Sequence, residues 1–462
     1  MSHIETKNKY FILTGISIAS FIGCIDFTIV NTALPAIQAG LNASIGELQW
    51  VINIFILALS AFMVVAGKVA DIYGRRLVLY LGMGIFAIAS LFAGLSTTIY
   101  QLIFWRFLQG VSCTILYTAT GAIISEAFPI SEKGKAMGIL FGVNALGLAI
   151  GPVIGGMIIG ALSWHYVFFI NIPLILLSLI ICLPHVSESR NKVNKNNIDF
   201  IGAVILVIGL CLLFFTLNQA NNWGWYSPKT LFMSFTAIAL LVLFHIVEKR
   251  TSEPIIKFSL FTNRDFVISI IATFSLAFFY CIAFFLIPLY LHDIKGYSDY
   301  AVGLMLLPIT ATIAVSSPLV GRYIDKNGAI KPLLWGFICF LISAFLQAQF
   351  SLDSPLWYII LAFICMGIGW ACILSPSTVL ALSATPASDS ALAMGASWTL
   401  HNIGGVVGLA GGLAVYYFKY QTTHSFLVGY QSAMTLLIAF SSVSFLIIFY
   451  LKSYNQTMSK LN

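Results

Sequence analysis

The sequence predicts an all-α integral membrane protein with 14 transmembrane helices and with both termini in the cytoplasm. Three observations support this fold class: the composition, the spacing of the apolar runs and the distribution of basic residues. Of the 462 residues, 60% are hydrophobic and 8% are charged, whereas a soluble domain has about 25% charged residues. This composition excludes a soluble enzyme. It also excludes a nucleic-acid-binding protein, because the formal net charge of +7 is modest and spread over the flanks of the apolar runs.

Apolar runs of the length that crosses a bilayer, about 20 residues, occur fourteen times. The first run contains Asp26 and is too long for the apolar part of a signal peptide, so we expect it to be a transmembrane helix. The predicted spans are residues 11–34, 49–66, 77–96, 101–125, 137–161, 166–184, 199–218, 230–247, 267–291, 301–320, 333–350, 357–381, 392–417 and 427–451.

Basic residues fall mainly on one side of these spans. With the N-terminus in the cytoplasm, 19 of the 23 Lys and Arg lie in cytoplasmic segments, three lie outside and Arg106 lies within a span. This asymmetry is the positive-inside pattern. A missed or additional span would invert every later loop and destroy it, so the loop charges support the number of spans.

A loop motif of the form G-x-x-x-D-x-x-G followed by basic residues occurs twice. The second copy begins 254 residues, or eight predicted spans, after the first, so both copies lie on the cytoplasmic face. We therefore expect two six-helix bundles, residues 1–184 and 266–462, and a linker, 185–265, whose two inserted helices face lipid. The first copy comprises Gly67, Asp71, Gly74, Arg75 and Arg76, and the second comprises Gly321, Asp325 and Gly328.

The residue types of this motif indicate a role at the contact between the two bundles. Glycines permit tight turns and close helix approach, and Asp71 can accept hydrogen bonds from the N-terminus of a neighbouring helix. Arg75 and Arg76 can pair with acidic groups on the same face. The alternative is a generic basic cytoplasmic loop, which a second copy at the matching position disfavours.

Asp26 is the only carboxylate well inside a predicted span. A charged residue at the bilayer centre costs about 2.5–3.5 kcal/mol on insertion scales, so we expect Asp26 to face a water-filled cavity and to bind and release a proton. Arg106 lies at a similar depth in the fourth span, and a nearby cation stabilises a carboxylate. The alternatives are a structural Asp26 bonded to a hydroxyl such as that of Thr28, and an Arg106 that extends to the outer interface.

The motifs resemble those of the Major Facilitator Superfamily, and in particular its fourteen-span drug/proton antiporter branch. The two cytoplasmic loops resemble the superfamily's motif A, and residues 25–35, IDFTIVNTALP, resemble the first-helix signature of the branch. Residues 106–110, RFLQG, resemble motif B, and residues 147–156 resemble motif C, the antiporter motif of the fifth helix. The resemblance implies alternating access by rocking of the two halves, with motif A closing the cytoplasmic side.

The remaining site candidates are small, aromatic or polar residues within spans. Motif C places small residues at three- and four-residue spacing, which favours close helix packing in lipid, and its proline allows a bend. His401 is the only titratable group deep in a C-terminal span apart from Tyr and Cys, and it is a weaker candidate for proton relay. The motif C residues are Gly147, Gly151, Pro152, Gly155 and Gly156, and the candidates for lining a substrate pocket are Asn31, Trp50, Tyr280, Trp398 and Asn402.

The expected function is proton-coupled export of amphipathic drugs or toxic compounds across the cytoplasmic membrane. The sequence has no G-x-x-x-x-G-K-[ST] loop, so uphill transport would use an ion gradient, and we expect no cofactor, metal or catalytic residue. The expected partners are a small-molecule substrate, protons and the lipid bilayer, and we expect a monomer. The alternatives are a dedicated exporter of one metabolite, siderophore or antibiotic and, from another class, a membrane-embedded enzyme.

Overall fold

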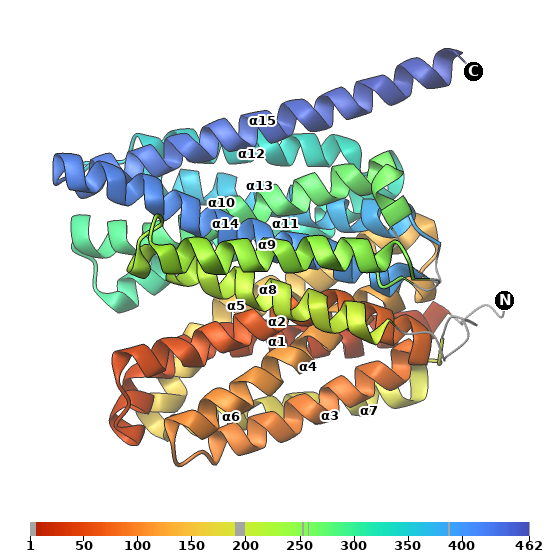
Figure 1. Cartoon of the computed structure of the whole chain (residues 1–462), viewed down its shortest axis with the longest axis horizontal. Helices are drawn as coiled ribbons and strands as arrows, with labels where there is room; N and C mark the ends of the chain where they lie inside the picture. The colour runs from red at the N-terminus through yellow and green to blue at the C-terminus, as the bar shows by residue number, and fades with distance from the viewer. Residues whose placement is uncertain (1–5, 190–198, 252–253, 257, 387–388, 462) are drawn as a thin grey trace.

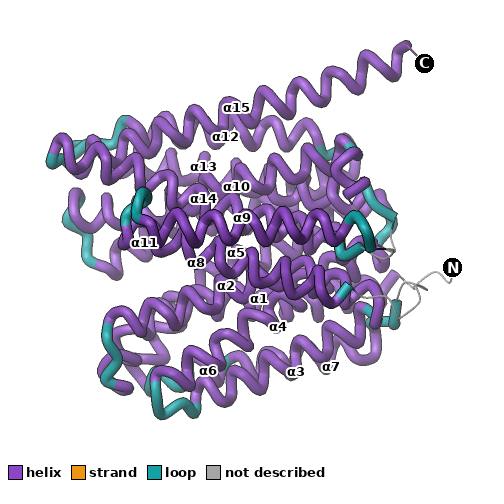
Figure 2. The backbone as a smooth tube through the Cα atoms, in the orientation of Figure 1, coloured by secondary structure: helices purple, strands orange, loops and turns teal. Residues whose placement is uncertain are grey.

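The computed structural model describes residues 6–189, 199–251, 254–256, 258–386 and 389–461. In these ranges the chain is helical, with no strand (Figure 2), and 14 helices are long and apolar enough to cross a membrane. The predicted fold class and number of spans are confirmed. Residues 1–5 of the predicted cytoplasmic N-terminus and residues 190–198 of the predicted linker lie outside the described part of the chain.

The first six spans are formed by seven helices, since a bend at Ile170 divides the sixth span into α6 and α7. Helix starts are set by side chains that accept the free amide hydrogens of the first turn. Ser44 forms a capping box with Glu47, and Thr98 caps the amide of Gln101. The helices are α1 (Thr6–Leu41), α2 (Ile45–Tyr73), α3 (Arg75–Gly94), α4 (Ile99–Ala127), α5 (Ile130–Ala161), α6 (Tyr166–Phe169) and α7 (Asn171–His185).

The second set of six spans has the same order of helices. It comprises α10 (Arg264–Leu289) with a short π-helical end, η2 (Tyr290–Ile294), α11 (Asp299–Asn327), α12 (Ile330–Ala348), α13 (Leu356–Ser383), α14 (Ser390–Thr423) and α15 (Phe426–Leu461). Between the two sets lie α8 (Phe200–Trp223), α9 (Pro228–Glu248) and the short 3₁₀ helix η1 (Phe258–Thr262).

The two sets of spans meet at two equivalent helix–helix contacts. Helix α2 packs on α14, and α5 packs on α11. Because α11 is the counterpart of α2 and α14 is the counterpart of α5, the two contacts are equivalent. Helix α1 begins and α15 ends at the same end of the molecule (Figure 1), as an even number of spans requires.

The inserted helices α8 and α9 lie across the junction of the two sets of spans (Figure 1). Helix α8 packs against both α2 and α14, and α9 packs on α8. The expectation of a lipid-facing insert fits α9, whose Phe232 and Phe235 are 70% and 73% exposed. The same expectation is wrong for one face of α8, because Phe214, Phe215 and Leu217 line a cavity at the centre of the protein.

Candidate substrate cavity and buried ion pair

Asp26 and Arg106 form an ion pair in the interior of the N-terminal helices. The Nη1 group of Arg106 donates a hydrogen bond of 2.5 Å to Oδ2 of Asp26, and the two residues are 1% and 0% exposed. The Nε group of Arg106 donates to the carbonyl oxygen of Val51 in α2. The predicted proximity of the two charged groups is therefore present, and neither side chain extends to the surface.

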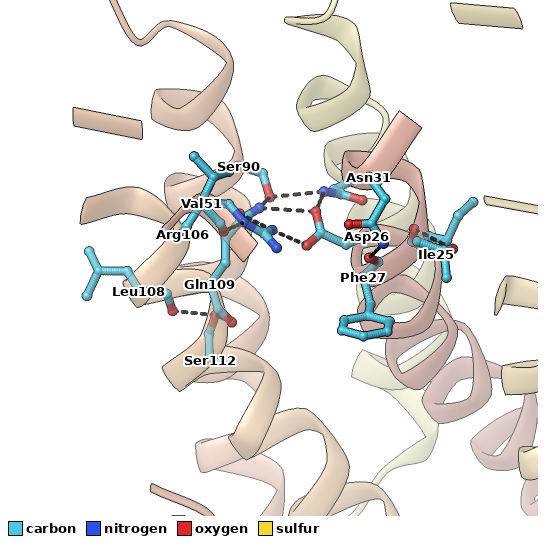
Figure 3. A network of polar contacts seen from close by, with 12 residues as sticks. Ile25, Asp26, Phe27, Asn31, Val51, Ser90, Arg106, Leu108, Gln109 and Ser112 are labelled. Carbon is cyan, nitrogen blue, oxygen red and sulfur yellow. Dashed lines mark hydrogen bonds and ion pairs between the residues drawn. The ribbon is translucent and has the colours of Figure 1, made fainter. Parts of the chain in front are cut away.

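Neutral polar side chains complete the surroundings of Asp26. Gln109, one turn after Arg106 on α4, donates to Oδ1 of Asp26 at 3.4 Å (Figure 3). Asn171, at the start of α7, donates to the same oxygen at 2.8 Å. Gln109 also accepts a bond from Arg106 and donates to Ser90 of α3. Helices α4 and α7 thus donate directly to the carboxylate, and α2 and α3 hold the donors Arg106 and Gln109 in place.

Two aromatic rings separate this pair from the central cavity. The guanidinium of Arg106 lies 4.3 Å from the ring centroid of Phe55, and the ring of Phe55 lies 6.4 Å from that of Phe27. Phe27 lines the cavity, whereas neither Asp26 nor Arg106 does. We expected Asp26 to face water. In this conformation the expectation is wrong, because the ring of Phe55 covers the guanidinium and the carboxylate is enclosed by polar side chains.

A cavity of about 480 Å³ lies between the two sets of spans, which is the size of many drug-binding pockets. On α14 its lining runs from Trp398 to Leu413, so both ends of that helix, residues 390–397 and 414–423, lie outside it. The cavity therefore lies at the middle of this helix. Ten aromatic residues line it: Phe27, Trp50, Tyr117, Phe141, Phe214, Phe215, Tyr280, Phe285, Trp370 and Trp398.

Four of the five predicted lining residues, Trp50, Tyr280, Trp398 and Asn402, lie on this cavity. Asn31 does not. Its side chain is exposed and donates to the carbonyl oxygen of Phe27. On α1 the lining comprises Cys24 and Phe27 and ends one turn before Asn31.

His401 also lines the cavity, and both of its ring nitrogens have partners. Nδ1 lies 3.0 Å from the hydroxyl and 3.1 Å from the carbonyl oxygen of Thr273. Nε2 lies 3.3 Å from the hydroxyl of Tyr280, from which it can accept. This set of bonds is satisfied by the neutral imidazole. His401 therefore lies at the cavity, and its hydrogen-bond partners, Thr273 and Tyr280, are not those of the Asp26–Arg106 pair.

Helix α8 contributes Phe214, Phe215 and Leu217 to the cavity wall. The ring of Phe215 stacks on Trp50 of α2 at 5.6 Å between centroids and an interplanar angle of 20°. This contact closes the space between α2 and α14, on which α8 packs. The insert is therefore part of the cavity, which the hydropathy of its sequence did not predict.

The first motif A loop contacts the start of α14. The carboxylate of Asp71 accepts hydrogen bonds from the amides of Leu392 at 2.9 Å and Ala391 at 3.4 Å, as its sequence position predicted. Arg75 donates to Asp71 at 2.9 Å and also reaches Glu126. The side chain of Arg76 instead lies over the ring of Tyr80.

The second motif A loop makes the equivalent contact with α5. Asp325 accepts bonds from the amides of Gly134 at 2.7 Å and Lys135 at 2.8 Å. Gly321 and Gly134 let the two backbones meet, since a Cβ on Gly134 would lie 2.5 Å from the carbonyl oxygen of Gly321. Gly67 packs in the same way on the backbone of Ala391, so both contacts close the cytoplasmic end.

Gly74 and Gly328 form the turns that follow the two acidic residues. Each adopts a positive φ, 115° for Gly74 and 80° for Gly328, a conformation that glycine adopts without steric cost. The turns join α2 to α3 and α11 to α12.

The motif C glycines pack α5 against α1, the helix that carries Asp26. A Cβ on Gly151 would collide with the side chain of Thr28, and one on Gly155 would collide with Thr32. Gly147 faces Phe21 and Cys24 in the same seam. Gly156 is different, because it is exposed and has no atom within 4 Å of an added Cβ. Pro152 lies inside α5, where it removes one helix hydrogen bond.

This difference predicts unequal effects of two alanine substitutions. Gly151→Ala would push α5 from α1 and is expected to lower transport activity at least fivefold, with a thermal unfolding temperature several degrees lower. Gly156→Ala should change neither quantity, because its methyl group meets open space. Equal behaviour of the two variants in purified form would contradict this account of the seam.

The sequence analysis assigned no role to Gln109, which lies in motif B, or to Asn171. A signal was present, because each is an uncharged polar residue within a predicted span, and such a residue needs a partner when it is buried. Both are fully buried. The cavity-lining residues Ser60 and Asn144 likewise received no role, although each is a polar residue within a predicted span.

The fold and cavity define a multi-spanning membrane protein with repeated halves around a central binding site, which is the arrangement of a solute transporter. The chain belongs to the Major Facilitator Superfamily, whose family model matches residues 16–409. It is therefore a membrane transporter of the cell membrane and not an enzyme.

Several relatives are named for drug resistance or for transport. The chain is 32% identical over 408 residues to Multidrug resistance protein Stp of Mycobacterium tuberculosis (strain CDC 1551 / Oshkosh), covering 88% of this chain and 75% of that protein. It is 29% identical to the Tetracenomycin C resistance and export protein of Streptomyces glaucescens, covering 86% and 74%. It is also 29% identical to the Riboflavin transporter RibZ of Clostridioides difficile (strain 630), covering 87% of each.

Solved structures share the fold at low sequence identity. The human organic anion transporter MFSD10 (TETRAN) superposes with a TM-score of 0.68 at 16% identity, covering 95% of this chain and 99% of that one. The proton:xylose symporter XylE superposes with the same TM-score at 12% identity, covering 96% of each chain.

Proposed function

We propose that this transporter is a proton-coupled antiporter that exports amphipathic organic compounds by alternating access. The observation that carries the proposal is the Asp26–Arg106 pair, a carboxylate fully enclosed within the N-terminal helices and held by a single guanidinium. A buried pair of this kind responds strongly to the loss of one charge, since removal of one partner costs about 3–5 kcal/mol. Protonation of Asp26 is such a loss.

The proton cycle follows from the contacts of Asp26. A proton from the outer side would bind a carboxylate oxygen of Asp26 and break the bond from Nη1 of Arg106. The guanidinium would keep its bonds to Val51 and Gln109 but lose its counter-charge, so this conformation becomes unfavourable. The transporter would then rock to the state that opens to the cytoplasm, where Asp26 releases the proton and cargo enters.

The cargo acts on the same pair through two rings. A compound in the cavity contacts Phe27, which contacts Phe55, which covers Arg106. Displacement of Phe27 would therefore alter the packing over the guanidinium. Protonation and cargo binding would each change the stability of one arrangement of Arg106, which is the thermodynamic requirement for coupling.

The cargo can be many compounds or one. The relatives include a multidrug resistance protein, a resistance and export protein named for tetracenomycin C and a transporter named for riboflavin. The wide aromatic cavity favours broad specificity. Growth of cells with and without the transporter on a panel of dyes and antibiotics separates the two cases, because a dedicated exporter protects against one compound.

Inside-out vesicles that contain the transporter test the coupling. With an acidic interior, addition of a transported compound from such a panel should raise the interior pH as protons leave in exchange for cargo. Nigericin, which collapses the pH gradient, should stop the accumulation of that compound. Uptake that is insensitive to nigericin and evokes no pH change would refute the proposal.

A further inference from the structure

We infer that the cavity selects electrically neutral, planar aromatic compounds that carry a hydrogen-bond donor and an acceptor, in preference to cations of the same shape. This inference rests on the proposed function and names its substrate class. The first observation is the absence of charge. Among the described residues that line the cavity there is no Asp, Glu, Lys or Arg, and the carboxylate of Asp26 is neutralised by Arg106 behind two aromatic rings.

The second observation is a set of three buried polar atoms without a partner in the described protein. The three atoms are Oγ of Ser60, Oδ1 of Asn144 and Nδ2 of Asn402, and all three residues line the cavity. Asn144 donates its amide hydrogen to Ser20, so its oxygen remains free to accept. A buried polar atom that lacks a partner costs about 1–3 kcal/mol. A ligand that donates to Asn144 and accepts from Asn402 recovers that energy.

The third observation is the arrangement of rings. Tyr117 from the first half stacks with Trp398 from the second at 5.8 Å and 19°, and Tyr280 stacks with Trp370 at 4.3 Å and 29°. The stack of Trp50 on Phe215 adds a ring pair from the insert. Flat faces from three parts of the chain therefore bound the space, which favours a flat aromatic ligand.

Aromatic faces also attract cations, so the two effects must be compared. A cation over a ring gains about 0.5–2 kcal/mol. Removal of a charge from water without a counter-charge costs several kcal/mol per ion, and no carboxylate on the cavity supplies one. His401 adds no negative charge, and its bonds to Thr273 and Tyr280 leave no free acceptor on its ring. The balance therefore favours neutral ligands.

Two fluorescent tricyclic compounds of nearly equal shape test the inference. Acridone is uncharged and has an N–H donor and a carbonyl acceptor, whereas 9-aminoacridine is a cation at pH 7. Binding to the purified full-length transporter in detergent is measured by fluorescence polarisation. We expect acridone to bind at least tenfold more tightly than 9-aminoacridine. Equal binding, tighter binding of the cation or no binding of acridone would overturn the inference.

Substitutions on α14 assign the preference to the cavity. Asn402→Asp puts a carboxylate on the lining and should reverse the preference, with at least tenfold tighter binding of 9-aminoacridine. Asn402→Leu should weaken acridone binding at least fivefold. Gln421→Glu adds the same charge to an exposed position of the same helix, outside the cavity, and should leave both affinities unchanged. An unaltered preference in Asn402→Asp would overturn the assignment.

The binding assay is independent of proton coupling. If the transporter exchanges protons for cationic compounds in vesicles but binds 9-aminoacridine better than acridone, the proposed function stands and the inference is overturned. If the transporter binds acridone selectively but moves no protons, the proposed function is refuted and the selectivity of the cavity stands.

Discussion

Asp26→Asn is expected to abolish proton-coupled transport, with at least a 100-fold lower rate of proton/substrate exchange in proteoliposomes. Asparagine keeps the size of aspartate and can still accept hydrogen bonds from Asn171 and Gln109, so local packing is retained. It cannot exchange a proton, and it leaves the guanidinium of Arg106 without a counter-charge in a site with 1% exposure. Binding of substrate in detergent should persist, because neither residue lines the cavity.

A second variant separates loss of coupling from loss of stability. The double substitution Asp26→Asn with Arg106→Gln removes both charges, and it should recover much of the roughly 3–5 kcal/mol that a single unpaired charge costs. Its thermal stability should approach that of the wild type while its coupled transport stays absent. Asp353→Asn, at an exposed position in an outer loop, is the matched control and should behave as the wild type.

Two results would count against the coupling role of Asp26, and a third would invalidate the assay. Drug resistance and proton exchange at wild-type levels in Asp26→Asn would exclude it directly. Restored proton exchange in the double variant would move the proton site elsewhere. A control variant that lost exchange as well would show that the assay reports on expression and not on coupling.

Asp71→Asn is expected to open the cytoplasmic end more than Asp325→Asn does. Both carboxylates accept two backbone amides of a facing helix. Of these two carboxylates, only that of Asp71 forms an ion pair with an arginine in the described part of the chain, and this arginine, Arg75, is 4% exposed. Hydrogen bonds to a charged group contribute about 1.5–3 kcal/mol, and in Asp71→Asn the guanidinium of Arg75 additionally loses its closest counter-charge.

Hydrogen exchange measured by mass spectrometry detects this difference between the two variants. In Asp71→Asn one carboxylate oxygen is replaced by an NH₂ group, so the amides of Ala391 and Leu392 are left with a single, uncharged acceptor oxygen. The peptide that contains them should exchange at least tenfold faster. In Asp325→Asn the peptide that contains Gly134 and Lys135 should show a smaller increase. Transport should fall by at least tenfold in the first variant. Equal acceleration in both, or none in the first, would contradict the asymmetry.

The sequence predicted the fold well because bilayer physics leaves few choices. Helix length is set by membrane thickness, and each additional span would have reversed the sides of all later basic residues. The proximity of Asp26 and Arg106 followed from helix rise alone, since both lie at similar depths on helices that pack together. The contact of Asp71 with a helix start followed from the repeat and from electrostatics.

The parts that were not predicted share a physical cause. Lipid and protein interior are both apolar, so hydropathy cannot tell which face of a helix packs on protein. This is why Phe215 of α8 was expected to face lipid and instead stacks on Trp50. The enclosure of Asp26 depends on two rings, Phe27 and Phe55, that come together only in three dimensions.

The wall formed by Phe27 and Phe55 has an electrical consequence. In the proposed cycle it would keep the proton on Asp26 apart from the cargo in the cavity, so the proton would not share a binding site with a compound of matching charge. With neutral cargo and one proton exchanged per cycle, each cycle would carry one net positive charge inward and generate a current. The membrane voltage then contributes to export beside the pH difference, by about 2.3 kcal/mol per 100 mV for each proton.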